Sequence, residues 1–114
     1  VISELKQMMF AAEAQDAVLS KSYTGKQCRV LRSQFTDAWE KPGAPDTLPA
    51  PLQVFLCWAH GRTRMERARA KDFMTYPVGQ IVGDLTEETS VRQVVHDMLD
   101  ELVESKARLD RILG

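Results

Sequence analysis

Residues 90–113 read SVRQVVHDMLDELVESKARLDRIL, and this stretch decides the fold class. Ser90 and Gln93 match a capping box, in which the two side chains satisfy free backbone N–H groups at the start of a helix. Apolar side chains then recur every three or four residues, the spacing of one helix face, at Val91, Val95, Met98, Leu102, Leu109 and Ile112. The pattern predicts a helix of about 20 residues or more.

This helix is longer than the rest of the chain needs for its core. Twenty helical residues span about 30 Å, whereas a domain of this length has a radius of gyration of about 13 Å. If the rest of the chain does not cover them, Leu102, Leu109 and Ile112 form an exposed stripe. Together with Val95 and Met98 they roughly follow a heptad, with Ser105 as a polar defect. We therefore expect residues 91–113 to bind a protein partner, in the first place a second copy of the chain in a homo-oligomer.

The clearest break in the sequence precedes the second half of the chain. Residues 42–51 read PGAPDTLPAP and contain four of the five prolines. Proline fixes φ and lacks an N–H donor, so this stretch excludes a regular helix or a central strand. We expect a semi-rigid extended loop that serves as a connector. A docking segment for an aromatic-lined groove is the alternative.

Two helices are expected before this loop, as a helical pair over residues 1–41. The first covers about residues 3–21, where apolar residues lie near helical spacing and no glycine or proline interrupts. Gly25 is the first residue that adopts a left-handed conformation without strain, so it would follow the end of that helix. The second covers about residues 25–40, with one apolar stripe at Cys28, Leu31, Phe35 and Trp39.

The chain after the loop, residues 52–114, begins with a run that is nearly all apolar. Residues 52–59 predict a buried helix, with a buried strand as the alternative, because periodicity does not separate the two in a short run. Residues 62–73 return to a helix-forming and strongly basic composition. Residues 78–85 fit either a short helix or a strand.

Together these elements predict an all-α fold: one domain over residues 1–114, a small bundle of four to five helices. The chain is 44% hydrophobic and 27% charged, which argues against wholesale disorder. No run approaches the eighteen apolar residues of a membrane span. Its two cysteines, Cys28 and Cys57, are typical of reduced core residues, which favours an intracellular location, cytoplasmic or nucleoid/nuclear.

The formal net charge of -1 conceals an uneven distribution. A basic segment precedes an acidic one, since residues 84–104 carry seven acids against Arg92 alone. The two regions could face each other or solvent. The alternative is a nucleic-acid-binding regulator, in which residues 78–95 form a helix-turn-helix and Arg92 reads bases. Its phosphate contacts would be Arg62, Arg64, Arg67, Arg69 and Lys71.

Catalytic, cofactor and metal sites receive little support from the sequence. Cys57 and His60 are one pair with metal-ligand spacing, whereas a structural zinc site takes four ligands. Two acidic pairs, Glu13 with Asp16 and Glu101 with Glu104, resemble the arrangement in all-α enzymes that cleave nucleotide pyrophosphates with Mg²⁺. Such pairs are also frequent on solvated helices. We therefore expect no catalytic, cofactor-binding or metal-binding residues.

These observations favour a small non-enzymatic interaction or regulatory module that self-associates through its C-terminal helix. The long apolar stripe and the charge partition support this hypothesis directly, and the lack of a catalytic motif supports it indirectly. The nucleic-acid-binding regulator is the second hypothesis. A Mg²⁺-dependent nucleotide hydrolase is the third.

Overall fold

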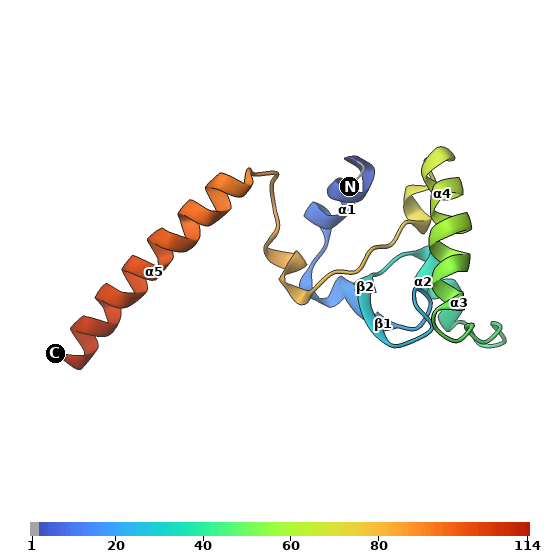
Figure 1. Ribbon diagram of the computed structural model, residues 1–114, viewed down its shortest axis with the longest axis horizontal. Helices are drawn as coiled ribbons and strands as arrows, with labels where there is room; N and C mark the ends of the chain where they lie inside the picture. Colours follow the sequence, from blue (N-terminus) through green and yellow to red (C-terminus); the bar gives the residue numbers. More distant parts are fainter. Residues whose placement is uncertain (1–2) are drawn as a thin grey trace.

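The computed structural model describes residues 3–114, so the first two residues of the expected helical pair lie outside it. The chain is mostly helical but has a two-stranded antiparallel sheet, so the all-α prediction is wrong in the strict sense. The elements in order are α1 (Ser3–Ala11), η1 (Ala14–Asp16), β1 (Ala17–Ser20), β2 (Cys28–Leu31), α2 (Gln34–Glu40), α3 (Leu52–Val54), η2 (Phe55–Arg62), α4 (Thr63–Arg67), η3 (Lys71–Phe73), η4 (Gln80–Asp84) and α5 (Val91–Leu113) (Figure 1).

A β-hairpin replaces parts of the two helices expected before the Pro-rich loop. The first helix ends early, and the Asp16 carboxylate then accepts a hydrogen bond from the Glu13 N–H at 2.8 Å. β1 and β2 pair from Ala17 opposite Leu31 to Ser20 opposite Cys28. Only α2 remains helical in the second segment, and Thr36 Oγ1 caps it by accepting from the Ser33 N–H at 2.9 Å.

The segment before η4 runs along the free edge of β2. The Leu31 N–H donates to the Tyr76 carbonyl at 2.9 Å, and the Val78 N–H donates to the Arg29 carbonyl at 3.2 Å. The Thr75 hydroxyl adds a bond to the Leu31 carbonyl at 2.5 Å. These bonds fix Tyr76 beside the hairpin, although it is far from β2 in sequence.

Residues 52–67 form one helical stretch made of α3, the π-helical segment η2 and α4. The expected helix over residues 52–59 is therefore present, and the expected loop over residues 42–51 has no regular structure. This helix is not the buried helix that the sequence predicts, since the buried side chains within residues 52–59 are those of Gln53 and Cys57. The apolar side chains of Leu52, Phe55 and Leu56 are exposed instead.

Gln53 joins three segments of the chain at this point. Its Nε2 donates to the Ser22 carbonyl of the hairpin loop at 2.6 Å, and its Oε1 accepts from the Leu48 N–H of the Pro-rich loop at 3.0 Å. One turn later, the buried Cys57 thiol contacts the same Ser22 carbonyl at 3.2 Å. The hairpin loop, the Pro-rich loop and the helix are thus held to one another through the Gln53 amide.

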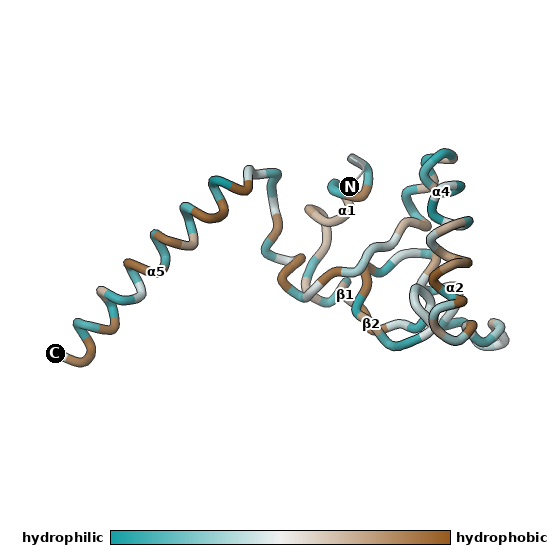
Figure 2. Tube along the Cα trace, viewed as in Figure 1, coloured by the Kyte–Doolittle hydropathy of each residue, from teal (hydrophilic) through white to brown (hydrophobic). Residues whose placement is uncertain are grey.

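The long C-terminal helix, α5, is confirmed with 23 residues and projects from the rest of the molecule (Figure 1). The Ser90 Oγ caps it by accepting from the Gln93 N–H at 3.1 Å, whereas the Gln93 side chain bonds Asp97 rather than completing a capping box. The radius of gyration is 18.3 Å, well above the value of about 13 Å for a compact chain of this length. Hydrophilic and hydrophobic residues alternate along α5 (Figure 2). Within residues 3–114, no helix is both long and apolar enough to cross a membrane.

Candidate functional site

The candidate site is an arginine held between aromatic rings. Trp58, Arg62 and Glu66 are spaced four residues apart along η2 and α4, which places them on one side of the helix. The Arg62 guanidinium carbon lies 4.5 Å from the centroid of the Trp58 ring and 5.5 Å from that of Tyr76. Both distances are within the range of cation–π attraction. The Arg62 Nε donates to Glu66 Oε1 at 2.6 Å, which fixes the plane of the guanidinium.

A third aromatic residue, Tyr23, completes this cluster from the hairpin loop. Its ring packs edge-on against Trp58 at a centroid distance of 5.2 Å, and Trp58 in turn meets Tyr76 at 6.0 Å. The Tyr23 hydroxyl is buried and has no hydrogen-bond partner. Burial raises the pKa of Tyr23 far above its ordinary value, and the nearby Arg62 charge offsets only part of that rise. A buried hydroxyl without a protein partner is costly.

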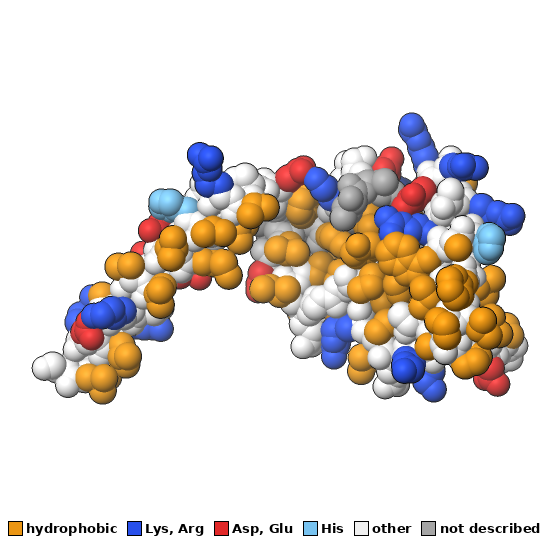
Figure 3. Space-filling model, in the orientation of Figure 1, with side chains coloured by type: hydrophobic (Ala, Val, Ile, Leu, Met, Phe, Trp, Pro, Cys, Tyr) orange, Lys and Arg blue, Asp and Glu red, His pale blue; other side chains and the backbone are white. Residues whose placement is uncertain are grey.

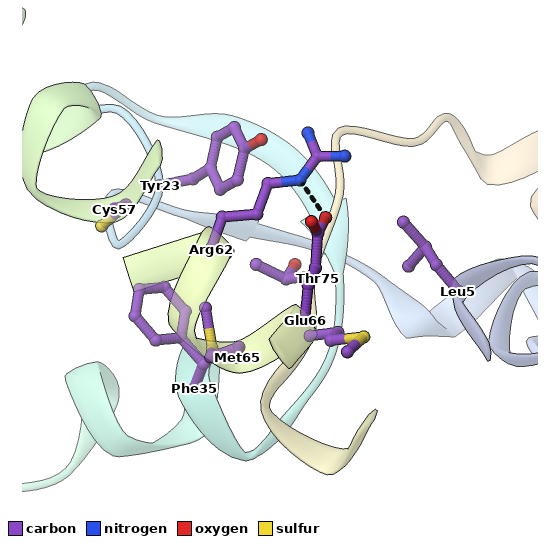
Figure 4. A pocket seen from close by; sticks show the side chains of 9 residues that line it. Leu5, Tyr23, Phe35, Cys57, Arg62, Met65, Glu66 and Thr75 are labelled. Carbon is purple, nitrogen blue, oxygen red and sulfur yellow. Dashed lines mark hydrogen bonds and ion pairs between the residues drawn. The ribbon is translucent and has the colours of Figure 1, made fainter. Parts of the chain in front are cut away.

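Arg62 and Tyr23 border a small pocket whose remaining lining is mostly apolar (Figure 4). Leu5, Phe35, Met65 and Met74 line it, together with Glu66, Thr75 and Cys57. The cavity encloses about 20 Å³, enough for one water-sized molecule. Pockets that enclose a drug-sized ligand measure about 300–1,000 Å³. The cavity as it stands is therefore too small for an organic ligand.

The electrostatics of the cluster suit an oxygen-bearing ligand. The hydrogen bond that Arg62 donates to Glu66 raises the pKa of Arg62, so the guanidinium stays positively charged at any physiological pH. Within residues 3–114, only its Nε has a hydrogen-bond partner, which leaves the two terminal nitrogens available as donors. In Figure 4 one of these nitrogens lies toward the Tyr23 hydroxyl and the other points away from it. Together the groups can bind a carboxylate or carbonyl oxygen by charge-assisted hydrogen bonds.

The described part of the chain forms no cluster of three or more histidine, cysteine or acidic side chains that could hold a metal ion. Cys57 contacts the Ser22 carbonyl and Gln53, and burial raises the pKa of its thiol, which disfavours the thiolate that binds metals. Asp16 caps the Glu13 backbone, and Glu101 and Glu104 lie on the projecting α5. The two acidic pairs thus do not face each other.

The structure separates the residues of the expected nucleic-acid surface. Arg62 is engaged with Trp58, Tyr76 and Glu66, whereas Arg64, Arg67, Arg69 and Lys71 are exposed at and beyond the end of α4. Arg92 lies in the first turn of α5, away from α4 (Figure 1). The basic segment and Arg92 therefore do not form one continuous basic face.

Comparison with known proteins gives one informative match. No family model and no solved structure matches the chain. A protein of Mycobacterium tuberculosis matches the chain in sequence. Its name is "Putative monooxygenase Rv1533", and it is 37% identical to this chain over an alignment of 115 positions that covers 96% of this chain. The chain spans 30% of the length of this relative.

This match corrects the functional expectation. The relative is named as an enzyme, so the expected non-enzymatic interaction or regulatory module is wrong, and the match supports neither a nucleic-acid-binding regulator nor a nucleotide hydrolase. The lack of a recognisable catalytic motif therefore does not indicate a non-enzymatic protein here. Cofactors carry oxygen chemistry, and one segment of such an enzyme need not contain the residues that hold them.

Sequence reasoning treated Arg62 as one of five equivalent basic residues and did not consider Tyr23 or Tyr76. One signal was present: tryptophan, arginine and glutamate at positions 58, 62 and 66 share a helix face if the segment is helical. No local signal relates Tyr23 or Tyr76 to this face. Their positions depend on the hairpin and on the segment that pairs with β2.

The buried Tyr23 hydroxyl predicts a loss of stability at alkaline pH. Because the folded state raises the pKa of Tyr23, the unfolded chain releases this proton first, above about pH 10. The free energy of unfolding should then fall as the pH rises. Cys57, whose pKa is also raised, contributes in the same direction.

The variant Tyr23→Phe separates the two contributions. It should be at least as stable as the wild type at pH 7, since it removes an unpaired buried hydroxyl. Between pH 9 and 11 it should lose less stability than the wild type. Urea unfolding at several pH values measures both effects, and identical pH profiles for the two proteins would contradict the assignment.

Proposed function

We propose that this chain supplies one wall of the substrate site of a monooxygenase, with Arg62 binding an oxygen atom of the substrate. The observation that carries the proposal is the 37% identity to the mycobacterial relative across nearly the whole chain. The cluster of Arg62, Tyr23 and Tyr76 adds a chemical reason. It is the place in the described structure where a fixed cation, an unpaired buried hydroxyl and an apolar pocket meet.

A monooxygenase reaction consumes O₂, two electrons and two protons, puts one oxygen atom into the substrate and releases the other as water. A redox cofactor supplies this chemistry when bound. The residues described here do not fit a metal centre, because no three suitable ligands converge. The cavity is also smaller than an organic substrate needs. The oxygen-activating group would therefore belong to the part of such an enzyme that lies outside the matched segment.

Each side chain of the cluster has a definite role in this proposal. The terminal nitrogens of Arg62 and the hydroxyl of Tyr23 donate hydrogen bonds to the substrate oxygen, which orients the substrate. Glu66 is a positioning residue, because its bond to the Arg62 Nε fixes the guanidinium. The rings of Trp58 and Tyr76 cover part of that guanidinium, although the Arg62 side chain remains 29% exposed.

A chimeric enzyme tests the proposal. This chain replaces the matching segment of the mycobacterial relative, and oxygen consumption is measured with compounds that a screen shows the intact relative to oxidise. We expect the chimera to consume oxygen with those compounds. A folded chimera without activity, beside an active relative, would refute the proposed function.

The variant Arg62→Met in the same chimera tests the assigned site. A hydrogen bond to a charged group contributes about 1.5–3 kcal/mol, so KM should rise by about 10- to 100-fold with a smaller change in kcat. Arg64→Met is the matched control, since Arg64 is exposed and lies outside the aromatic cluster. Equal kinetic constants for the two variants would exclude the substrate role of Arg62.

A further inference from the structure

The apolar face of α5 is the largest feature of the molecule that the proposed function leaves unused. Met98, Leu102 and Ile112 have 63%, 64% and 73% of their surface exposed. Figure 3 shows the apolar side chains as a row along one side of the helix, with no other element packed over them. The remaining members of this row are Val91, Val95, Leu109 and Leu113.

Such a helix needs a covering surface. Isolated helices in water gain little from propensity alone, and most helical stability in proteins comes from packing of the apolar face. Soluble monomers rarely expose a contiguous apolar patch larger than a few hundred Å². A row that extends over 23 residues therefore indicates a docking surface.

A second exposed apolar surface lies at the other end of the molecule. Leu52, Phe55 and Leu56 are 52%, 60% and 45% exposed on α3 and η2, next to the partly exposed rings of Phe35 and Trp39 from α2. Figure 3 shows apolar side chains gathered over this region. A partner that covers α5 alone would leave this second surface in water.

The mycobacterial relative indicates what covers these surfaces. The match includes 96% of this chain, so it reaches into α5, and the relative has a counterpart of this helix. The matched segment is 30% of the relative, so that helix belongs to a much longer polypeptide. A body of that size can cover both apolar surfaces, whereas one copy of this chain paired through α5 covers one of them.

We propose that the apolar face of α5 docks against the oxygen-activating body of the monooxygenase, the part that corresponds to the unmatched portion of the relative. The identity of the partner rests on the proposed function. The contact residues are Val95, Met98, Leu102, Leu109 and Ile112, and the polar side of α5 remains in solvent. Docking of α5 brings the cluster of Arg62, Tyr23 and Tyr76 next to the rest of the active site.

Hydrogen exchange measures this docking without reference to activity. In this chain alone, the amides of α5 should exchange quickly and the mass in solution should be that of a monomer. In the full-length chimera described above, the same peptides should exchange more slowly by about 10-fold or more. The intact mycobacterial relative provides the same measurement on its matching segment if the chimera does not fold.

Paired variants in the chimera locate the docking face. Leu102→Glu should abolish the protection of α5, because it places a charge in an apolar interface. Asp100→Lys, on the polar side of the same helix, should leave the protection unchanged. Fast exchange of this segment in both the chimera and the relative would overturn the proposal. A dimer of this chain alone with α5 protected would also overturn it, in favour of the second copy that the sequence predicts.

An inactive chimera with a protected α5 would refute the proposed function and leave the docking intact. An active chimera with an unprotected α5 would refute the docking and leave the proposed function intact. The failure of one proposal can therefore be distinguished from the failure of the other.

Discussion

Replacing Gln53 with leucine is expected to destabilise the protein by about 2–5 kcal/mol, although leucine is the more apolar residue. The Gln53 side chain is fully buried and satisfies two backbone groups, the Ser22 carbonyl and the Leu48 N–H. Each backbone group left without its partner costs about 1–3 kcal/mol. Leucine fills the space but bonds neither group, so the hairpin loop and the Pro-rich loop both lose their attachment to the helix.

Urea unfolding followed by circular dichroism measures this effect against a matched control. Gln27→Leu makes the same chemical change at an exposed glutamine and should alter stability by less than about 0.5 kcal/mol. Gln53→Glu keeps an acceptor for the Leu48 N–H but places a fully buried carboxylate against the Ser22 carbonyl, so at pH 7 it should be at least as destabilised as Gln53→Leu. Equal stabilities for Gln53→Leu and Gln27→Leu would show that the buried amide does not hold the loops.

Much of the helical structure could be predicted from the sequence, because its signals are local. The Ser90 cap and the regular apolar spacing after it define α5 without reference to any other part of the chain. The Pro-rich loop is equally local, since proline restricts its own backbone. The length of α5 also indicated that the helix would project from the rest of the chain.

The hairpin could not be predicted because both of its strands are short. β1 and β2 have four residues each, and apolar residues three apart, such as Cys28 and Leu31, fit a helix equally well. What selects the strand is pairing with a partner that is distant in sequence, here including the segment around Tyr76. Local propensity gives way to such contacts.

Contacts between distant segments also explain why residues 52–59 are not buried as the sequence predicts. They explain as well why the sequence did not reveal the cluster around Arg62. A glutamine within an apolar run suggests the solvent side of a helix, yet Gln53 is inside because two loops present backbone groups to it. Leu52 and Phe55 are outside on a surface that the docking partner is proposed to cover. Arg62 differs from the neighbouring basic residues through Tyr76, which tertiary structure brings to it.

Gly25→Ala is expected to have the second large effect, about 3 kcal/mol of destabilisation, because of where the hairpin loop meets the Pro-rich loop. Gly25 has φ +81°, a left-handed conformation that costs a residue with a Cβ about 1–2 kcal/mol. A Cβ there would also lie 2.2 Å from the Leu48 carbonyl oxygen and 2.9 Å from the Ala50 nitrogen. Both are backbone atoms, so the Pro-rich loop would have to move, and the Leu48 bond to Gln53 would weaken with it.

Gly43→Ala separates the two parts of this cost within the same protein. Gly43 has φ +82°, almost the same backbone conformation, but no atom lies within 4 Å of a Cβ at that position. It should therefore show the conformational cost alone, about 1–2 kcal/mol. The difference between the two midpoints of urea unfolding measures how closely the hairpin loop and the Pro-rich loop approach each other. If the two alanine variants unfold at the same midpoint, the two loops do not pack together as described, and the attachment through Gln53 is also in question.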